Sequence, residues 1–484
     1  MKTKLRTLSL LLAALLASSA LSACGSEPVN TDNGGDTSAA DTSAEAEKGY
    51  DYPTDYSGDT VNILNIEDIF SMHAVIDTGE TNGDTLNDTQ YNAVRKLEDM
   101  TGITWNETNV DLMSEFSNIV QQTILAGDDE YDIIYQGSMD FYKFTSQGFY
   151  LNLLDYDEIA LDQPWWLASY NDYNVINGKL YTAMGYSNFT VVDAICCLMF
   201  NQSMMENLNL ELPYDAVREG KWTLDLFNTY LKAGANLNGD SAFNWTDSGS
   251  CVWGISVPSN TGVQWLYGCG EYGVVFEDGK LTITTGSESF YNACDKIANI
   301  LGATDGSIYL GHYSGDDAAG SYINCFEAER ALFGLSEVAK ANRMRGMEYD
   351  YGVLPLPKYD EAQSRYYTSV SFPASGVSIP VTCQNPERAA AIGDAINYIF
   401  YTDVWPVFRE VTLESKNLRN DDSIEMLDIV LNSAYPNLVE IYSIDSNYMP
   451  EISAKLRAGD SGVASVFASH QSAIQTAIDE INDQ

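Results

Sequence analysis

Polar side chains follow two predicted strands in the first third of the chain. Glu67 and Asp68 come directly after one apolar run. Gln136 comes directly after another, and Asp140 follows four residues later. Carboxylates and amides can hydrogen-bond the hydroxyl groups of a small polar ligand. The sequence therefore predicts four ligand-binding residues here: Glu67, Asp68, Gln136 and Asp140.

Aromatic side chains gather further along the chain. Six of the eight tryptophans lie between Trp165 and Trp265. A sugar presents apolar C–H faces with hydroxyl rims, so a sugar site needs flat aromatic surfaces beside carboxylates and amides. Large aromatic residues are mostly buried in any protein. The cluster is therefore compatible with a sugar site and with an ordinary core.

The elements that must position the four polar residues alternate in type. Strand patterns occur over residues 61–66, 103–105 and 131–135, and apolar residues at helical spacing occupy 91–100 and 112–124. Alternation of strands and helices is typical of a mainly parallel α/β sheet. Ligands of such sheets bind beyond the carboxyl ends of the strands, which is where the four polar residues fall.

A series of motifs resembles, in order, the extracellular solute-binding proteins of ABC importers, family 1, the relatives of maltose-binding protein. The resemblance covers nearly everything from Thr60 to the end of the chain. The motifs are Tyr131-Asp-Ile-Ile-Tyr-Gln-Gly-Ser-Met-Asp140, Gly148-Phe-Tyr-Leu-Asn-Leu153, Asn177-Gly-Lys-Leu-Tyr181, Phe326-Glu-Ala-Glu-Arg-Ala-Leu-Phe333, Tyr351-Gly-Val-Leu-Pro-Leu-Pro357 and Asn385-Pro-Glu-Arg-Ala-Ala390.

The resemblance implies an α/β fold of the two-lobe, periplasmic-binding-protein-like type (type II), with discontinuous lobes joined by a hinge. Lobe 1 would comprise residues 59–165 and 372–412, and lobe 2 residues 166–371 and 413–484. The residues themselves support the last motif, because Asn385-Pro386 suits the N-cap and the first position of a helix.

The resemblance also suggests further ligand-binding residues, in the second lobe and near the chain crossings. These are Trp166, Tyr186, Asn188, Gln264, Trp265, Ser371 and Phe372. Glu337 joins them, because it follows a predicted strand and can accept sugar hydroxyl hydrogens. Alternatives stay open: core packing for Trp265, packing at the lobe junction for Trp166, an ordinary turn at 186–188, and helix capping by Glu337.

The N-terminus carries a signature of its own. Basic residues precede an apolar run over 8–17, and Leu21-Ser-Ala-Cys24 then resembles a bacterial lipoprotein box. The resemblance implies a signal peptide over 1–23, a lipid on the Cys24 sulfur, and anchoring at the cell surface, in the outer leaflet of the cytoplasmic membrane. An ordinary secretory signal is the alternative. The polar segment 24–58 predicts a flexible acidic linker.

The composition excludes some partners. The chain has 484 residues, 45% of them hydrophobic, so it can build more than one sizeable core. Its formal net charge of −44 should repel nucleic acid and anionic lipid. Only a covalent anchor would then hold the chain at a membrane.

Motifs for chemistry beyond binding are missing from the sequence. The three histidines have no metal-binding spacing, and neither a Gly-x-Ser-x-Gly elbow nor a phosphate loop occurs. Seven cysteines besides Cys24 cannot all pair, although a Cys251–Cys269 disulfide stays possible. Residues 236–247 resemble a calcium loop but lack its glycine and its final glutamate. We expect no cofactor, no metal and no enzyme activity.

The predicted function is that of a lipid-anchored substrate-binding protein of an ABC importer. It would capture an oligosaccharide between two lobes, as a monomer, and deliver it to the permease subunits. Two alternatives stay open: a binding lipoprotein for peptides or another small solute, and a surface glycoside hydrolase.

Overall fold

The computed structural model describes most of the chain after residue 48. The described residues are 49–68, 70, 72–138, 140–258, 260–277, 279–311, 319–344, 347, 349–371, 374–414 and 421–483. The predicted signal peptide (residues 1–23), Cys24, most of the predicted linker and Phe372 lie outside them. The described residues from Tyr52 onward form one compact unit, and every element below belongs to it. Within the described residues, no helix is long and apolar enough to cross a bilayer.

The first sheet has four strands in the order β14 (Ser375–Ser378), β3 (Ile133–Gly137), β1 (Thr60–Ile66) and β2 (Thr104–Val110). β1 runs parallel to β2 and β3, whereas β14 is antiparallel to β3. This is the predicted arrangement of the first three strands, with one strand added from a distant part of the chain.

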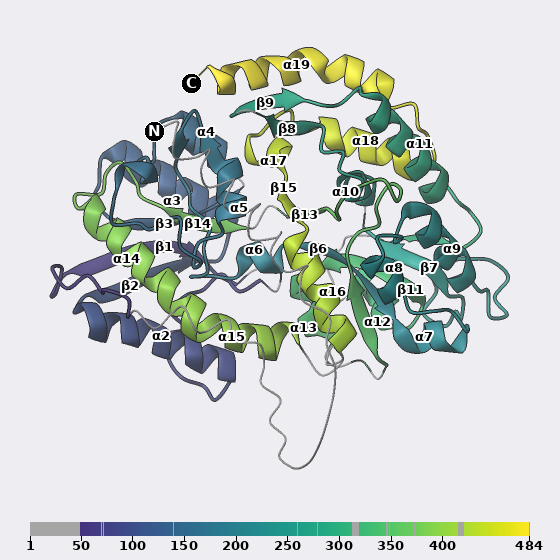
Figure 1. Ribbon diagram of the computed structural model, residues 1–484, viewed down its shortest axis with the longest axis horizontal. Helices are drawn as coiled ribbons and strands as arrows, with labels where there is room; N and C mark the ends of the chain where they lie inside the picture. Colours follow the sequence, from purple (N-terminus) through teal and green to yellow (C-terminus); the bar gives the residue numbers. More distant parts are fainter. Residues whose placement is uncertain are drawn as a thin grey trace, which may run out of the picture. The chain divides into compact units, whose positions relative to one another are not determined.

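The two helices between these strands form where their apolar spacing predicts them. α2 (Thr85–Thr101) begins after Asp84, whose side chain accepts the Leu86 and Asn87 N–H groups. α3 (Met113–Ala126) ends at Gly127, which takes the left-handed conformation (φ 75°) that glycine adopts without strain. Figure 1 shows α2 and α3 on opposite sides of the sheet.

A later helix completes this part of the fold. α14 (Pro386–Ile399) packs against α2. Asn385 caps it, because its Oδ1 accepts the Arg388 N–H at 3.2 Å. The predicted cap is therefore confirmed. α15 (Trp405–Phe408) continues the same run, flanked by π-helical turns at Phe400–Val404 and Arg409–Leu413.

The second sheet has five strands in the order β10 (Ile308–Leu310), β7 (Trp253–Val257), β11 (Ala331–Glu337), β6 (Cys196–Asn201) and β12 (Tyr351–Leu354). β7 is parallel to β10 and β11, and β6 is antiparallel to β11 and β12. Figure 1 shows the two sheets apart from each other within Tyr52–Gln484. Three two-stranded ribbons complete the strands: β4 (Val175–Ile176) with β5 (Lys179–Leu180), β8 (Val274–Glu277) with β9 (Lys280–Ile283), and β13 (Thr368–Val370) with β15 (Ala434–Pro436).

The cysteines are part of this core. Cys196 and Cys197 on β6 are fully buried, as their apolar surroundings predict. All seven cysteines of the described residues are buried and free. The disulfide considered for Cys251 and Cys269 is therefore not formed.

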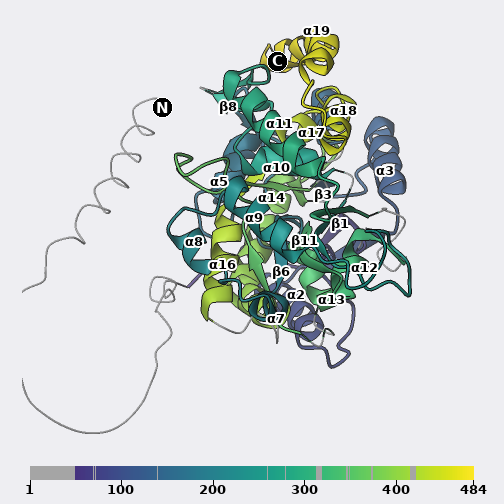
Figure 2. The ribbon, with the colours of Figure 1, turned by 90° about the vertical axis from the view of Figure 1, so that its right-hand side faces the viewer.

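The remaining helices surround these sheets, and the last two pack on the second part of the fold. Figures 1 and 2 show α18 and α19 lying over α10 and α11, and α18 contacts all three. Their bounds, with those of the other helices, are α4 (Phe141–Ser146), α5 (Ala168–Asn171), α6 (Thr190–Asp193), α7 (Gln202–Asn207), α8 (Tyr214–Arg218), α9 (Leu224–Gly234), α10 (Thr261–Gly268), α11 (Glu288–Leu301), α12 (Tyr322–Glu327), α13 (Ala341–Met344), α16 (Asp421–Asn432), α17 (Leu438–Ile441), α18 (Tyr448–Arg457) and α19 (Ala464–Asn482). Short 3-10 helices occupy Leu153–Asp155, Asp172–Asn174 and Val338–Lys340.

Candidate functional site

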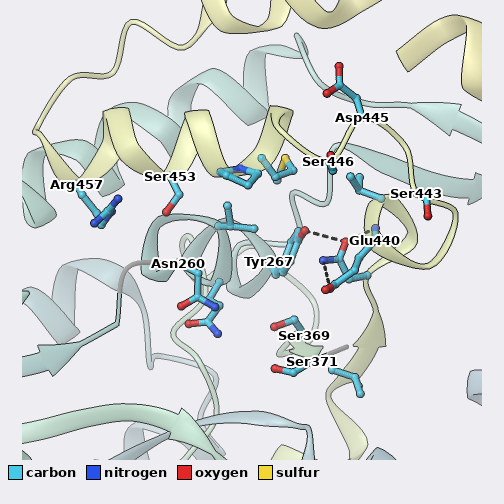
Figure 3. Close-up of a pocket in the computed structure, with 17 residues that line it drawn as sticks. Asn260, Tyr267, Ser369, Ser371, Glu440, Ser443, Asp445, Ser446, Ser453 and Arg457 are labelled. Atoms are coloured by element: carbon cyan, nitrogen blue, oxygen red, sulfur yellow. Dashed lines mark hydrogen bonds between the residues drawn. The ribbon is translucent and has the colours of Figure 1, made fainter. Parts of the chain in front are cut away.

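A cavity of about 520 Å³ lies among α10, β13, α17 and α18 (Figure 3). Small-molecule sites commonly enclose about 300–1,000 Å³. The cavity is thus large enough for a small ligand. Serine, asparagine, glutamine and charged side chains make up much of its wall.

One face of α10 forms part of this wall. Asn260, Val263, Gln264 and Tyr267 line the cavity, and their spacing places them on one side of a helix. Asn260 precedes the helix, but its side chain makes no capping hydrogen bond. Its amide is therefore not used to satisfy the backbone of α10.

A face of α18 forms a second part of the wall. Met449, Pro450, Ser453 and Arg457 line the cavity, again at helical spacing. α18 packs against α10, so two segments nearly two hundred residues apart in sequence enclose one space.

A buried thiol lies behind the polar floor of the cavity. Gln264, Ser369 and Ser371 line the cavity, and all three lie close to Cys196. Gln264 Nε2 is 3.2 Å from Cys196 Sγ, and the hydroxyl oxygens of Ser369 and Ser371 are 3.4 and 3.8 Å from it. Burial raises the pKa of Cys196 to about 12, so the group is a thiol at neutral pH.

Gln264 also carries an unused acceptor. The residue is 5% exposed, and its Oε1 atom is buried without a hydrogen-bond partner. A buried acceptor in this state costs about 1–3 kcal/mol. Oε1 is closed to water in this conformation, so a ligand hydroxyl would donate to it, and recover this energy, once the Gln264 amide turns toward the cavity.

A chain of hydrogen bonds holds a carboxyl group at the cavity (Figure 3). Tyr267 Oη donates to Asn437 Oδ1 at 3.0 Å, and Asn437 Nδ2 donates to Glu440 Oε2 at 3.0 Å. Burial raises the pKa of Glu440 to about 7, against the weaker, opposite effect of the Asn437 hydrogen bond. Water still reaches the carboxyl group through the cavity, since the residue is exposed.

The segment after α17 supplies a second acidic group. Asp445 lines the cavity, and its Oδ2 lies 2.6 Å from Nδ1 of His470 on α19. Hydrogen bonding to Asp445 raises the pKa of His470. The Asp445 carboxylate is therefore already paired with a histidine.

The wall of the cavity also contacts the part of the fold built on the first sheet. The Tyr442 ring, directly after α17, packs edge-on against Phe141 and Tyr142 of α4, at 6.4 and 5.9 Å between ring centroids. The Tyr442 hydroxyl donates to the Tyr173 carbonyl at 2.8 Å. A movement of one part of the fold relative to the other would therefore change the contacts that Tyr442 makes directly after α17.

Two of the residues predicted from the sequence line this cavity, namely Gln264 and Ser371. The other described candidates lie elsewhere. Most of them form hydrogen bonds or ring contacts with neighbouring residues outside the cavity, both near the first sheet and near the chain crossings.

Glu67 and Asp68 directly follow β1 and are exposed. The Asp68 carboxylate accepts the backbone N–H groups of Ala74 and Val75 at 2.7 and 2.9 Å. These hydrogen bonds stabilise the loop that follows β1. Gln136 on β3 is buried, and its Oε1 accepts the Tyr150 hydroxyl at 2.5 Å.

Asp140 begins α4 in a left-handed conformation (φ 62°), and its Oδ2 accepts the Ser117 hydroxyl at 2.6 Å. Trp166 is buried and donates from Nε1 to Asp394 Oδ1 at 2.8 Å. Both residues therefore have structural partners outside the cavity.

Tyr186 and Asn188 occupy the loop before α6. The Tyr186 ring lies 5.0 Å from that of Tyr401 and 5.1 Å from that of Trp405, between ring centroids. Asn188 is buried and donates from Nδ2 to Ser375 Oγ at 3.2 Å. The loop is thus tied to β14.

Trp265 is fully buried, and its ring packs edge-on against Phe227 at 5.5 Å. It points away from the cavity face of α10, as the core alternative describes. Glu337 ends β11 and makes no side-chain cap on the following 3-10 helix. Phe372 lies outside the described residues.

Sequence reasoning missed the segment 437–457, which supplies Asn437, Glu440, Asp445, Ser453 and Arg457 to the cavity. Its helical spacing on α18 was a usable signal for Ser453 and Arg457. The asparagine and glutamate of α17 carried no comparable pattern, because that helix has only four residues.

Within the described ranges, no group of three or more histidine, cysteine, aspartate or glutamate side chains is placed to hold a metal ion. In the calcium-like loop, Asp240 Oδ2 accepts the N–H groups of Ser250 and Cys251, both at 2.7 Å. That carboxylate stabilises the loop itself.

No protein-family model matches the chain, and no curated protein matches its sequence. Solved structures do match its fold. A cyclo/maltodextrin-binding protein in complex with maltotetraose is similar over 89% of this chain and 99% of its own, at 14% identity and a TM-score of 0.57. The GacH receptor of Streptomyces glaucescens, solved unliganded and with acarbose, is similar over 87% and 98%, at 11% identity and a TM-score of 0.56. Apo RafE of Streptococcus pneumoniae is similar over 90% and 99%, at 14% identity and a TM-score of 0.54.

The chain therefore has the two-lobe α/β fold of the solute-binding proteins of ABC importers. The structural neighbours match the family that the ordered motifs resemble. The chain covers nearly the whole length of each neighbour. The exact crossing points predicted for the two lobes stay a prediction.

Proposed function

We propose that this chain is the lipid-anchored substrate-binding component of an ABC importer and that its cargo is an oligosaccharide. The observation that carries the proposal is a fold shared with binding proteins for maltotetraose and acarbose, together with a polar cavity of about 520 Å³. These neighbours are binding proteins rather than enzymes, so we propose that the chain binds and releases its cargo unchanged.

The cavity offers the groups that a sugar needs. Gln264 Oε1 is a buried acceptor without a partner, and Glu440 presents a carboxyl group held by Asn437. Ser369 and Ser371 add hydroxyl groups at the floor. Sugar hydroxyls can donate to the first two and exchange hydrogen bonds with the serines.

Delivery would require lobe closure and an anchor. Tyr442 directly follows α17 and contacts both α4 and the Tyr173 carbonyl. A ligand that binds α17 more tightly when these contacts are formed would favour the state that contains them. A lipid on Cys24 and the segment 24–58 would keep the folded part near its permease. The anchor, the permease and a monomeric state belong to the proposal.

Isothermal titration of the full-length chain in detergent against plant and host oligosaccharides tests the proposal, with peptides as controls and product analysis on the same mixtures. We expect tight binding of at least one glycan without turnover. Binding of peptides alone would replace the sugar with another solute. Cleavage of the glycan would instead indicate a surface glycoside hydrolase.

A further inference from the structure

Arg457 differs from every other arginine that the structure describes. Five of these arginines form ion pairs with carboxylates, and two donate to backbone carbonyl groups. The former are Arg95, Arg218, Arg343, Arg388 and Arg409, and the latter are Arg330 and Arg365. Among the described residues, Arg457 has no such partner. Its Nε is buried without a hydrogen-bond acceptor, as are those of Arg95 and Arg388, but these two arginines pair with carboxylates through their other nitrogens. The guanidinium group lines the cavity.

The scarcity of cations makes this position informative. The chain has 25 lysine and arginine residues against 69 aspartate and glutamate residues, so carboxylate partners are abundant. In Figure 3, Arg457 lies beside Ser453 and near Asn260, at the end of the cavity away from Glu440 and Asp445. The cavity thus has one cationic end and one acidic end.

Helix electrostatics alone do not explain why the Arg457 side chain lines the cavity. Cations favour the last turn of a helix, and α18 has two there, Lys455 and Arg457. Lys455 does not line the cavity and pairs with Asp460 at 2.6 Å. Arg457 instead reaches the cavity, where its buried Nε makes no hydrogen bond.

A ligand that excludes water from this end must compensate the guanidinium group. A buried donor without an acceptor costs about 1–3 kcal/mol, and more when it is charged. A carboxylate, sulfate or phosphate can accept two parallel N–H bonds from an arginine, and such charge-assisted pairs are about twice as strong as neutral ones. Asp445 at the other end is already paired with His470, so repulsion of an anion from there is reduced.

We propose that the cavity selects an acidic sugar, whose carboxylate, sulfate or phosphate group binds Arg457 between Ser453 and Asn260. The inference rests on the proposed function and names the class of its cargo. The hydroxyl groups of the same sugar would reach Gln264 and Glu440.

Titrations of the full-length chain in detergent test the inference. Each acidic ligand is paired with a neutral counterpart: uronate-containing oligosaccharides, sulfated disaccharides and sugar phosphates, each against the unmodified sugar. Arg457→Gln removes the guanidinium group. Lys455→Gln is the matched control, because it removes the same charge from the same helical turn without touching the cavity.

We expect at least one acidic sugar to bind about tenfold tighter than its neutral counterpart. Arg457→Gln should weaken binding of that sugar about tenfold to a hundredfold and leave the neutral one nearly unchanged. Lys455→Gln should change neither by more than about threefold. The pair of ligands that shows this difference identifies the anionic group as a carboxylate, a sulfate or a phosphate. Added salt should lower the affinity for the acidic sugar more in the wild type than in Arg457→Gln.

Three outcomes would overturn the inference. If neutral sugars bind as tightly as acidic ones, or if Arg457→Gln weakens both alike, the anion site is wrong while sugar binding stands. If no sugar of either series binds, the proposed function fails as well. Thermal unfolding of each variant separates misfolding from loss of binding, and Arg457→Lys, which keeps the charge but not the two parallel N–H bonds, should recover part of the lost affinity.

Discussion

Asn437 Nδ2 donates a hydrogen bond to Glu440 Oε2 across 3.0 Å, while Asn437 Oδ1 accepts the Tyr267 hydroxyl at the same distance. The asparagine side chain thereby links a buried tyrosine of α10 to a carboxyl group of α17. It fixes Glu440 at the cavity wall, where burial raises the pKa to about 7.

This raised pKa should make stability depend on pH. Between about pH 4.5 and about pH 7, the folded state holds a proton on Glu440 that the unfolded state has released, so stability should fall as the pH rises through this range. Glu440→Gln should remove this loss. The variant should match the wild type at low pH and exceed it above pH 7 by on the order of 1 kcal/mol, a value reduced because water reaches the carboxyl group.

Urea unfolding of the ligand-free chain across this pH range measures the effect. Glu480→Gln, on the exposed surface of α19, is the control and should run parallel to the wild type. A Glu440→Gln curve that also runs parallel to the wild type would contradict burial as the cause.

Replacing Gln264 by leucine should raise the free energy of unfolding and lower the affinity for the ligand. Gln264→Leu removes an acceptor that is buried without a partner, so the ligand-free variant should gain about 1 kcal/mol of unfolding free energy. Ligand affinity should fall roughly tenfold, because the hydroxyl that would donate to Oε1 loses its acceptor. Chemical unfolding and titration measure the two quantities.

Gln90→Leu is the control for this prediction. Gln90 is equally buried, at 5% exposure, but its Nε2 donates to the Val75 carbonyl at 2.9 Å. That variant should lose stability and keep its affinity. The prediction would be wrong if Gln264→Leu were destabilised and bound ligand like the wild type.

Asp394 should be one of the most sensitive positions in the fold. Its Oδ1 accepts the Ala160 N–H and the indole N–H groups of Trp165 and Trp166, at 3.0, 2.9 and 2.8 Å. Asp394→Ala leaves these donors without that acceptor and should cost about 3 kcal/mol. Urea unfolding followed by circular dichroism gives the value.

An exposed aspartate in the same part of the fold provides the comparison. Asp403 pairs with Lys96 at 2.6 Å, and both side chains are more than a third exposed. Asp403→Ala should change stability by less than about 1 kcal/mol. Equal losses in the two variants would show that the Asp394 cluster contributes no more than a surface ion pair.

The cysteines should react with thiol reagents only after unfolding. All seven in the described residues are buried and free, and burial raises the pKa of Cys196 and Cys383 to about 12. The thiolate is the reactive form, so the native chain should label slowly. In denaturant, without reductant, at least seven thiols should react. Fast labelling of the native chain, or fewer than seven thiols, would contradict this state.

Much of the fold follows from local patterns in the sequence. The alternation of strands and helices up to residue 137 predicts the parallel core of the first sheet, and Asn385-Pro386 marks the start of α14. These signals are local, since each depends on apolar spacing or on one capping side chain.

The cavity is less predictable because it depends on packing between distant segments. Every residue of α10 is buried, so its apolar pattern does not separate the cavity face, with Gln264 and Tyr267, from the core face with Trp265. The facing wall comes from α18, and no pattern in the sequence pairs these two helices. Glu440 gains its raised pKa only from this packing.

A crystal structure of the full-length chain with its tightest-binding glycan tests the central claim most directly. We expect intact glycan in the cavity, with one hydroxyl at Gln264 Oε1, another at Glu440, and an anionic group at Arg457. Glycan bound elsewhere on the chain, or cleaved within the cavity, would contradict it.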